Sequence, residues 1–420
     1  MDNYVFLIPA VILTVFVIVL NLPLTAPVSG ADSQWYIAIA HGRINEVIKP
    51  FSGRFLHPFL VGQLNYYFSA GINESFLLIA VVSLFLFFVI NSFLFKKTLP
   101  SPFLMIPLFL SPYFAAIFRE FFQPDIFYIF LTAVFFLLIF YKKENLGLLT
   151  LFILFLARES TIFLGLIMLV VASLHSKKTL FISTLFVIIL SVSITYYINN
   201  MGLPNAHNLN NFTYIFLKIP YNFIRNVLGI QPWVNTLSGN CNPVFRSDLP
   251  QWLKLGSVNS FGFCGFDIHF PLNAAVSLFT IFGVMPTVLF FAISHRFKFI
   301  VNQAPAWLII ALAYGVGYYF ISLITTTGVQ RIMGYGWPAF LLAAPFLVGA
   351  FFQVDKNFII KISLIQIFVV WLPMVVGKVG AQEIGPAVLI ILISLAAHFY
   401  TFRLLKIQKW RDELTAIEFK

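Results

Sequence analysis

Charge is scarce in this 420-residue chain. Asp, Glu, Lys and Arg together make up 10% of the residues, whereas hydrophobic residues make up 60%. The mean hydropathy is +0.93. This composition excludes an ordinary soluble domain and predicts a polytopic membrane protein. Since a spanning helix needs about 20 apolar residues, the length leaves room for about a dozen crossings.

The sequence also lacks the motifs that mark nucleotide-driven or zinc chemistry. It contains no Gly-rich phosphate loop, no zinc-ligand spacing and no GxSxG elbow. A nucleotide-driven cytoplasmic reaction is therefore not expected. The net charge of +11 would point to nucleic acid in a soluble protein. In a membrane protein it reflects the cytoplasmic bias of Lys and Arg, so no nucleic-acid partner is predicted.

Cysteine is rare as well, with two residues, Cys241 and Cys264. Both fall in segment 199–270, which is predicted to be extracytoplasmic and to form a partly ordered lid. An even cysteine count on the oxidising side of a membrane favours a disulfide, and two unpaired thiols are the alternative. Two cysteines alone give no zinc signature.

The hydrophobic runs predict an all-α protein of twelve crossings with both termini cytoplasmic. They lie near 4–22, 75–95, 102–118, 122–141, 146–157, 160–174, 179–198, 271–294, 304–326, 333–353, 358–377 and 385–402. The pair 146–157 and 160–174 is too short for two full spans, so it forms either two short helices or a re-entrant hairpin. The first span is expected to be a retained anchor because no basic region precedes it.

The chain is expected to be a single integral membrane domain, 1–420, in the plasma membrane. Fifteen Lys and Arg residues fall in turns or in the tail 403–420, all on the predicted cytoplasmic side, as the positive-inside rule requires. Two large extracytoplasmic segments remain, 23–74 and 199–270. The first includes an amphipathic stretch from Phe55 to Phe68 that is expected to lie in the membrane interface.

Eleven basic residues have no role in this topology, because they lie on the predicted outer side or within the membrane. They are Arg43, Lys49, Arg54, Arg119, Arg158, Lys218, Arg225, Arg246, Lys254, Arg331 and Lys378. Functional cations should come from this group.

Asp32 is the first candidate for chemistry. It stands about ten residues beyond the first span, just before Trp35 and Tyr36. A carboxylate at a membrane boundary, partly desolvated by aromatic rings, is suited to act as a general base. Asp32 also directly precedes the helix-like run SQWYIAIA, so an N-cap role is the alternative, and one residue can do both.

Further charged residues lie between apolar runs, where placing a charge in or near the membrane costs free energy. Arg119, Glu120 and Asp125 connect two apolar runs on the predicted outer side, where they either form a site or solvate a turn. Arg158 and Glu159 lie between the two short runs, where a mutual ion pair competes with phosphate binding as their role. Arg331 stands alone at the outer end of a span, so it either binds a ligand or snorkels to the headgroups.

Several of these motifs resemble a known family. Asp32 with WYIAIAHG, followed by PFSGRFLHPFL, resembles the N-terminal region of polytopic GT-C glycosyltransferases, with Arg54 and Pro58 matching an Arg-x-x-x-Pro-like element. The run QPDIFYIFLTAVFFLL resembles the acidic residue that opens a later span. LARESTIFL and QRIMGYGWPAFLL resemble Arg-bearing helices of that family. The similarity spreads over about 340 residues, in short motifs.

The resemblance implies a GT-C-like fold and an enzyme that uses a polyprenyl-phosphate sugar on the extracytoplasmic face. Asp32 matches the acidic residue that serves as catalytic base or metal ligand. A divalent cation, Mg or Mn, would have Asp32, Glu120 and Asp125 as candidate ligands, although neither loop contains a clear Asp-x-Asp. The residues expected to bind substrate are Arg54, His57, Arg119, Glu120, Asp125, Arg158, Glu159 and Arg331.

Two other classes of function stay open at this point. A transporter or flippase of lipid-linked glycans would also carry charged residues inside the bundle, together with broken helices. A polymerase or ligase of the O-antigen type would share the Arg-rich outer loops, usually without an acidic first loop. In each case the partners are the bilayer and a lipid-linked substrate, and the sequence does not identify the sugar or the acceptor.

Overall fold

A computed structural model describes the chain over residues 4–24, 32–99, 101–203, 211–234, 244–245, 261–326, 328–351, 355–376 and 384–418. The described chain is almost entirely helical, as predicted. The predicted disulfide between Cys241 and Cys264 lies outside what the structure describes.

The helices of the first half are α1 (Leu7–Leu20), α2 (Ser33–Ala40), α3 (Leu56–Phe68), α4 (Ile72–Thr98), α5 (Met105–Phe109), α6 (Pro112–Arg119), α7 (Asp125–Phe140), α8 (Glu144–Ala157), α9 (Ile162–Leu174) and α10 (Lys178–Met201). Those of the second half are α11 (Asn211–Leu228), α12 (His269–Thr280), α13 (Met285–Gln303), α14 (Ala306–Thr325), α15 (Val329–Met333), α16 (Ala344–Phe351), α17 (Lys356–Val376) and α18 (Ile384–Glu418). Short 3₁₀ turns occupy Ile44–Glu46, Phe51–Gly53, Pro102–Leu104, Glu159–Thr161 and Gly334–Gly336, and a π-helical stretch covers Pro338–Ala343.

Three short strands, β1 (Ile230–Val234), β2 (Val244–Phe245) and β3 (Phe261–Phe266), were not predicted. They form an antiparallel sheet in the order β1-β3-β2, with a register shift between Gln231 and Pro232. The sheet belongs to segment 199–270, which was expected to be partly ordered. Aromatic and β-branched residues in this segment favour strands where the helix-forming constraint of the bilayer does not apply.

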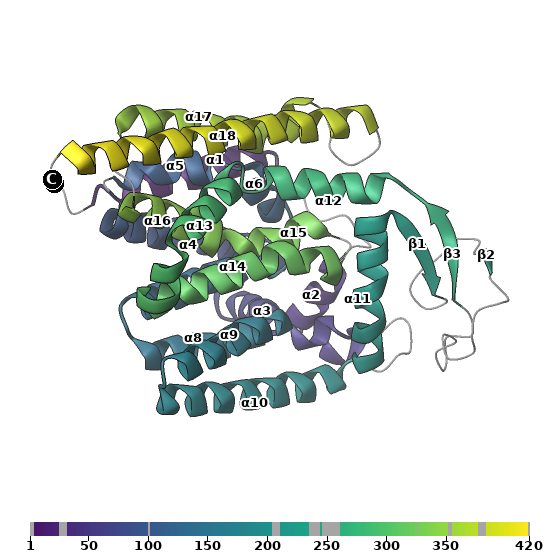
Figure 1. Cartoon of the computed structure of the whole chain (residues 1–420). Helices are drawn as coiled ribbons and strands as arrows, with labels where there is room; N and C mark the ends of the chain where they lie inside the picture. The colour runs from purple at the N-terminus through teal and green to yellow at the C-terminus, as the bar shows by residue number, and fades with distance from the viewer. Residues whose placement is uncertain are drawn as a thin grey trace.

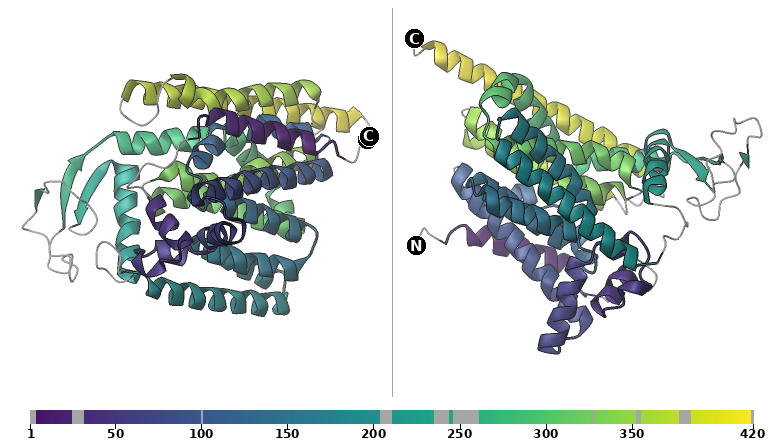
Figure 2. Two further views of the ribbon diagram at one scale, coloured as in Figure 1. Left: turned by 180° about the vertical axis from the view of Figure 1, so that it is seen from behind. Right: turned by 90° about the horizontal axis from the view of Figure 1, so that it is seen from below.

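The long helices run side by side, with α10 at one edge of the bundle and α17 and α18 at the other (Figure 1). Helix α11 lies across the helix ends, next to the small sheet, in both the front and the back view (Figure 2). Helix α2 lies at this same end, and the C-terminal end of α18 lies at the opposite one. The two segments predicted to be extracytoplasmic therefore share one end of the bundle.

Direct contacts tie these two segments together. Ile48 forms a parallel bridge with Leu203 just beyond α10. The Lys49 ammonium donates a hydrogen bond of 2.8 Å to the side chain of Asn200, and the Ser52 hydroxyl lies 2.6 Å from the Asn199 side-chain oxygen. The first outer segment is thereby fixed to the end of α10.

Within the described part of the chain, six helices are long and apolar enough to cross a membrane, or eight if each of two bent pairs forms one span. Four shorter apolar helices, Leu7–Leu20, Asp125–Phe140, Glu144–Ala157 and Glu159–Leu174, coincide with the remaining predicted crossings. These findings support a multi-pass membrane protein. The count of twelve stays a prediction, as does the choice between short spans and a re-entrant hairpin for 146–174. The amphipathic stretch predicted at Phe55–Phe68 forms helix α3.

The first bent pair is Pro102–Phe109 with Pro112–Arg119, at an angle of 69°. A helix cannot run through this point, because Pro112 disfavours helical geometry in the residue before it. The Ser111 side chain caps the new helix by accepting a hydrogen bond of 3.3 Å from the Tyr113 amide. On the other side of the break, the Leu110 carbonyl accepts a hydrogen bond of 3.0 Å from the Trp371 indole of α17.

The second bent pair is His269–Thr280 with Met285–Ile300, at an angle of 66°. Gly283 has φ +52° at this break, and a Cβ there would collide with the Gln366 side chain, so glycine is needed. The fully buried Gln366 accepts a hydrogen bond of 2.9 Å from the Val284 amide. Helix α17 thus satisfies backbone groups at both breaks, which apolar surroundings would otherwise make costly.

We expect Gln366→Leu to lower the free energy of unfolding by about 1–3 kcal/mol, because it leaves the buried Val284 amide without an acceptor. The measurement is thermal unfolding of the purified protein in detergent. Leu364→Ala, on the exposed face of the same helix, is the control and should have a smaller effect. Equal melting temperatures for wild type and Gln366→Leu would contradict the role assigned to Gln366.

The predicted orientation is tested by labelling two exposed serines that both adopt positive φ, Ser69 and Ser176. Each is replaced by cysteine in a background without Cys241 and Cys264, and intact cells are treated with an impermeant maleimide. We expect labelling at position 69, in the predicted outer segment, and none at position 176 before the cells are lysed. The reverse pattern would invert the topology.

Candidate functional site

The carboxylate of Asp125 lies at the start of α7 and is completely buried. Its partner is Arg158, which follows α8 and adopts an extended backbone conformation (φ −161°, ψ 129°). This geometry ends the helix, and the Arg158 guanidinium forms an ion pair with Asp125 Oδ1. Both side chains are withdrawn from solvent, with exposures of 4% for Arg158 and 0% for Asp125.

Tyr335 completes this buried pair from the last third of the chain. Its hydroxyl donates a hydrogen bond to Asp125 Oδ1 and accepts one from Arg158 Nη1. The Arg158 guanidinium also lies 5.0 Å from the centroid of the Tyr335 ring, within the range of a cation–π contact. The neighbouring Gly334 has no Cβ, which leaves the room that the ring of Tyr113 occupies.

Arg331 approaches the other oxygen of the same carboxylate. Its Nε lies 3.6 Å from Asp125 Oδ2, which accepts no hydrogen bond from the described residues. The Arg331 Nη1 donates a hydrogen bond to the Gln123 side chain, and Gln123 in turn donates one of 3.1 Å to Glu120. With 30% of its side chain exposed, Arg331 is the more accessible of the two arginines on Asp125.

The first outer segment joins this site through Arg54. Its Nε donates a hydrogen bond of 2.8 Å to Glu159 Oε2, its Nη2 binds Glu159 Oε1, and its Nη1 lies 3.3 Å from the Tyr36 hydroxyl. Burial acts to lower the pKa of the Arg54 guanidinium, but Glu159 and Tyr36 outweigh burial and hold that pKa well above its ordinary value. A mutual ion pair was one of the two alternatives for Arg158 and Glu159; instead, each of them pairs with a residue distant in sequence.

Asp32 immediately precedes α2, where it was predicted. Its side chain makes no capping hydrogen bond, so the N-cap alternative is wrong as far as the side chain is concerned. It stands one helical turn before Tyr36, on the same face of the helix. The carboxylate is partly exposed, and no hydrogen bond or ion pair within the described chain engages it.

His57 lies deeper than a substrate-binding residue is expected to lie. It is 1% exposed and stacks on Phe127, with ring centroids 5.6 Å apart. Burial lowers the pKa of His57 to about 3, although the nearby Asp125 carboxylate opposes this shift. The imidazole is therefore neutral at physiological pH and packs as an aromatic ring beside the site.

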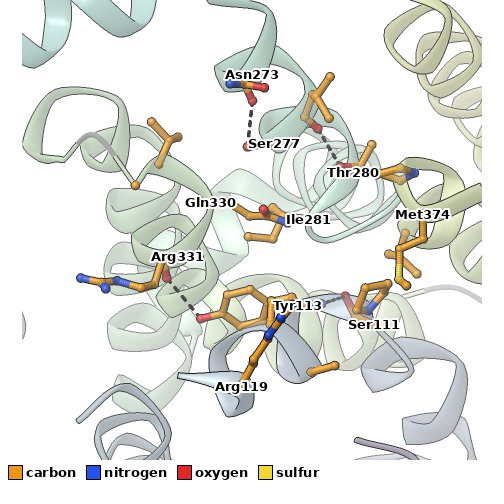
Figure 3. A pocket seen from close by; sticks show the side chains of 18 of the residues that line it. Ser111, Tyr113, Arg119, Asn273, Ser277, Thr280, Ile281, Gln330, Arg331 and Met374 are labelled. Carbon is orange, nitrogen blue, oxygen red and sulfur yellow. Dashed lines mark hydrogen bonds between the residues drawn. The ribbon is translucent and has the colours of Figure 1, made fainter. Parts of the chain in front are cut away.

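A cavity of about 710 Å³ adjoins these residues. Its polar side chains include Arg119, Arg225, Asn226, Asn273 and Gln330, and no Asp or Glu lines it. Its walls come from α6, α11, α12, α15 and α17, so both bent pairs contribute to it. Figure 3 shows the Arg331 guanidinium pointing away from the other labelled side chains, while its backbone carbonyl accepts a hydrogen bond of 3.3 Å from the Tyr113 hydroxyl.

The structure brings most of the predicted site residues together. Asp125, Arg158 and Arg331 form one group of ion pairs, and Arg54 pairs with Glu159, the chain neighbour of Arg158. Glu120 joins the same network through Gln123, Arg119 lines the cavity, and Asp32 stands one turn from the network at Tyr36.

Three residues of the site and its cavity were not singled out from the sequence: Tyr335, Gln123 and Arg225. Only Arg225 carried a signal, as one of the outer cations without a role in topology. The contacts of Tyr335 and Gln123 cross 210 and 208 residues of sequence, so no local pattern indicates them.

The predicted metal ligands do not fit a divalent cation as they are placed. Among the described residues, no three His, Cys, Asp or Glu side chains gather into a possible metal site. Asp125 Oδ1 is bound by Arg158 and Tyr335, and the Arg331 cation stands beside Oδ2. A second cation at Oδ2 would be repelled by that arginine.

Substitutions in the buried pair Asp125–Arg158 should lower the free energy of unfolding much more than substitutions in an exposed ion pair. Asp125→Leu or Arg158→Met alone should lower the free energy of unfolding by roughly 3–5 kcal/mol, because each leaves a buried charge without its partner. The double variant should recover at least half of that loss, since it removes both charges. Thermal unfolding of the four proteins in detergent measures this cycle.

The exposed pair Arg43–Glu46, with side chains 53% and 55% exposed, is the matched control. Its variants Arg43→Gln and Glu46→Gln should change stability by roughly 0–1 kcal/mol. A double variant of the buried pair that is as unstable as the sum of its single variants would contradict the coupling of Asp125 to Arg158.

Comparison of the chain with protein families, curated proteins and solved structures found no match. The site is therefore interpreted from its own geometry. Its elements are a buried carboxylate held by two arginines, an unengaged carboxylate one turn from the network, and an adjoining cavity with cationic lining.

Proposed function

We propose that this protein is a membrane glycosyltransferase that moves a sugar from a polyprenyl-phosphate donor to an acceptor hydroxyl on the extracytoplasmic face. The observation that carries the proposal is the network at one end of the bundle, which links the first outer segment to Asp125 and Arg331 through Arg54 and Glu159. A lipid-borne anion entering from the bilayer meets cations at this end. The sequence resemblance to GT-C glycosyltransferases points to the same activity.

In this mechanism Asp32 is the general base. The acceptor hydroxyl attacks the anomeric carbon of the sugar as Asp32 takes the hydroxyl proton. A new carbon–oxygen bond forms on one face of the sugar while the bond to the phosphate oxygen breaks on the other, which inverts the configuration. The bonding electrons leave with the polyprenyl phosphate, and the displaced lipid phosphate carries the charge away.

The arginines contribute unequally to that departure. Arg331 is partly exposed and has no carboxylate oxygen closer than 3.6 Å, so it is placed to stabilise the leaving phosphate. Arg158 is already bound by Asp125 and Tyr335. It would reach a phosphate only if that pair opened, and its role in the present geometry is to position Asp125 and Tyr335.

Asp32→Asn should lower the turnover of sugar transfer by roughly two to four orders of magnitude, because general-base assistance is lost while the side chain keeps its shape. The assay follows radiolabel from a set of polyprenyl-phosphate sugars in membranes that contain equal amounts of wild-type or variant protein. Glu46→Gln, which alters another exposed carboxylate of the same outer segment, is the control and should keep its activity. Full activity of Asp32→Asn would remove this residue from the mechanism.

A flippase or transporter of lipid-linked glycans is the second candidate, and a specific observation favours it. Two bent helix pairs, at 69° and 66°, border the cavity, and interrupted spans are typical of transporter sites. Reconstituted vesicles with a fluorescent lipid-linked sugar separate the two functions. Movement of the label between leaflets without transfer to an acceptor would favour the transporter.

A further inference from the structure

The cations of the site fall into two groups, which differ in whether their charge is already compensated. Arg54 and Arg158 each bind a carboxylate, and Arg331 lies near one. Arg119 and Arg225, in the cavity, form no hydrogen bond or ion pair with any side chain in the described ranges. Arg225 Nε is buried without a hydrogen-bond partner, which leaves a donor available to a ligand.

Several other polar groups of the cavity already donate to backbone carbonyls. The Ser277 hydroxyl donates 2.8 Å to the Asn273 carbonyl, and the Thr280 hydroxyl donates 2.7 Å to the Val276 carbonyl (Figure 3). The Asn226 amide donates to two backbone carbonyls, at 2.9 and 2.8 Å. No Asp or Glu lines the cavity, so its lining side chains carry net positive charge, although the Asp267 carboxylate outside the lining interacts electrostatically with Arg225.

The remainder of the lining is apolar. Leu20, Val276, Ile281, Val370 and Met374 come from α1, α12 and α17 and the break after α12. The volume of about 710 Å³ lies within the range of small-molecule pockets. A ligand that suits both parts has an anionic group for the arginines and a hydrocarbon chain for the apolar wall.

We propose that this cavity binds the phosphate group of a lipid, with Arg119 and Arg225 as its ligands, in a space that borders the Asp125 network at Arg331. Guanidinium groups match phosphate oxygens through paired hydrogen bonds, and burial strengthens such contacts. Arg225 is held for this role by its position over the ring of Phe270, 3.9 Å from the centroid. The bends in the two helix pairs open the space between α6 and α12 that the headgroup occupies.

The test is binding to the full-length protein in detergent, by calorimetry, with three probes. Geranyl phosphate carries both the anion and the chain, inorganic phosphate carries only the anion, and geraniol carries only the chain. We expect geranyl phosphate to bind at least tenfold more tightly than either of the others. Inorganic phosphate binding as tightly as geranyl phosphate would overturn the lipid as the source of the phosphate.

Arg119→Gln and Arg225→Gln should each weaken geranyl phosphate binding about tenfold, which is about 1.4 kcal/mol. Arg43→Gln removes the same charge from the exposed pair with Glu46 and should leave the affinity unchanged. Ala116→Phe keeps every charge but fills the cavity at an exposed lining position, so it should also abolish binding. Wild-type affinity in the double arginine variant, or in a folded Ala116→Phe protein, would overturn the site.

This inference and the proposed function fail independently, because binding is measured without turnover. If the arginine variants lose binding while no sugar donor is turned over by the wild type, the lipid-phosphate site stands and the glycosyltransferase does not. If sugar is transferred but geranyl phosphate binding does not depend on Arg119 and Arg225, the lipid-phosphate site is contradicted and the glycosyltransferase proposal is not.

Discussion

The buried carboxylate of Asp125 is the group around which the predicted outer end of the bundle is arranged. A charge without solvent is costly, and it is tolerated only when opposite charges and hydrogen bonds surround it. Here the compensation comes from Arg158, Tyr335 and Arg331, three residues that belong to different parts of the chain. The interaction therefore fixes the start of α7, the turn after α8 and the segment around α15 relative to one another.

The residues next to this pair are also held by compensation of opposite charges. Glu159 follows Arg158 directly, so the turn that delivers the cation to Asp125 also delivers a carboxylate to Arg54. Arg54 in turn contacts Tyr36 of α2. A partly exposed segment is thus held on the bundle by electrostatic contacts that weaken toward solvent, and the carboxylate of Asp32 lies at its accessible edge.

The cavity depends on a different constraint, which is the need to satisfy backbone groups wherever a membrane helix is interrupted. Helix α17 supplies Trp371 to one break and Gln366 to the other. Because both breaks are stabilised from the same helix, the two bends face a common space. Arg119 and Arg225 border this space without an ion pair at contact distance in the described chain, which distinguishes them from Arg54 and Arg158 and suits the cavity to an anion.

The amino-acid sequence by itself determined the class of the protein and the position of its apolar helices, but not helix α11 or the breaks inside the runs 102–118 and 271–294. The scarcity of charge and the length of the apolar runs were enough to predict membrane helices, because a bilayer requires each spanning segment to satisfy its own backbone hydrogen bonds. Charged residues such as Arg158 and Asp125 could be recognised as candidate site residues for the same reason, since they lie beside apolar runs. Only the tertiary structure decided their partners, since Asp125 lies 33 residues from Arg158 and 210 from Tyr335. An ion pair depends on distance in space and on burial, and neither can be read from local spacing. For that reason the mutual pairing that was one alternative for Arg158 and Glu159 is replaced by two contacts across the fold.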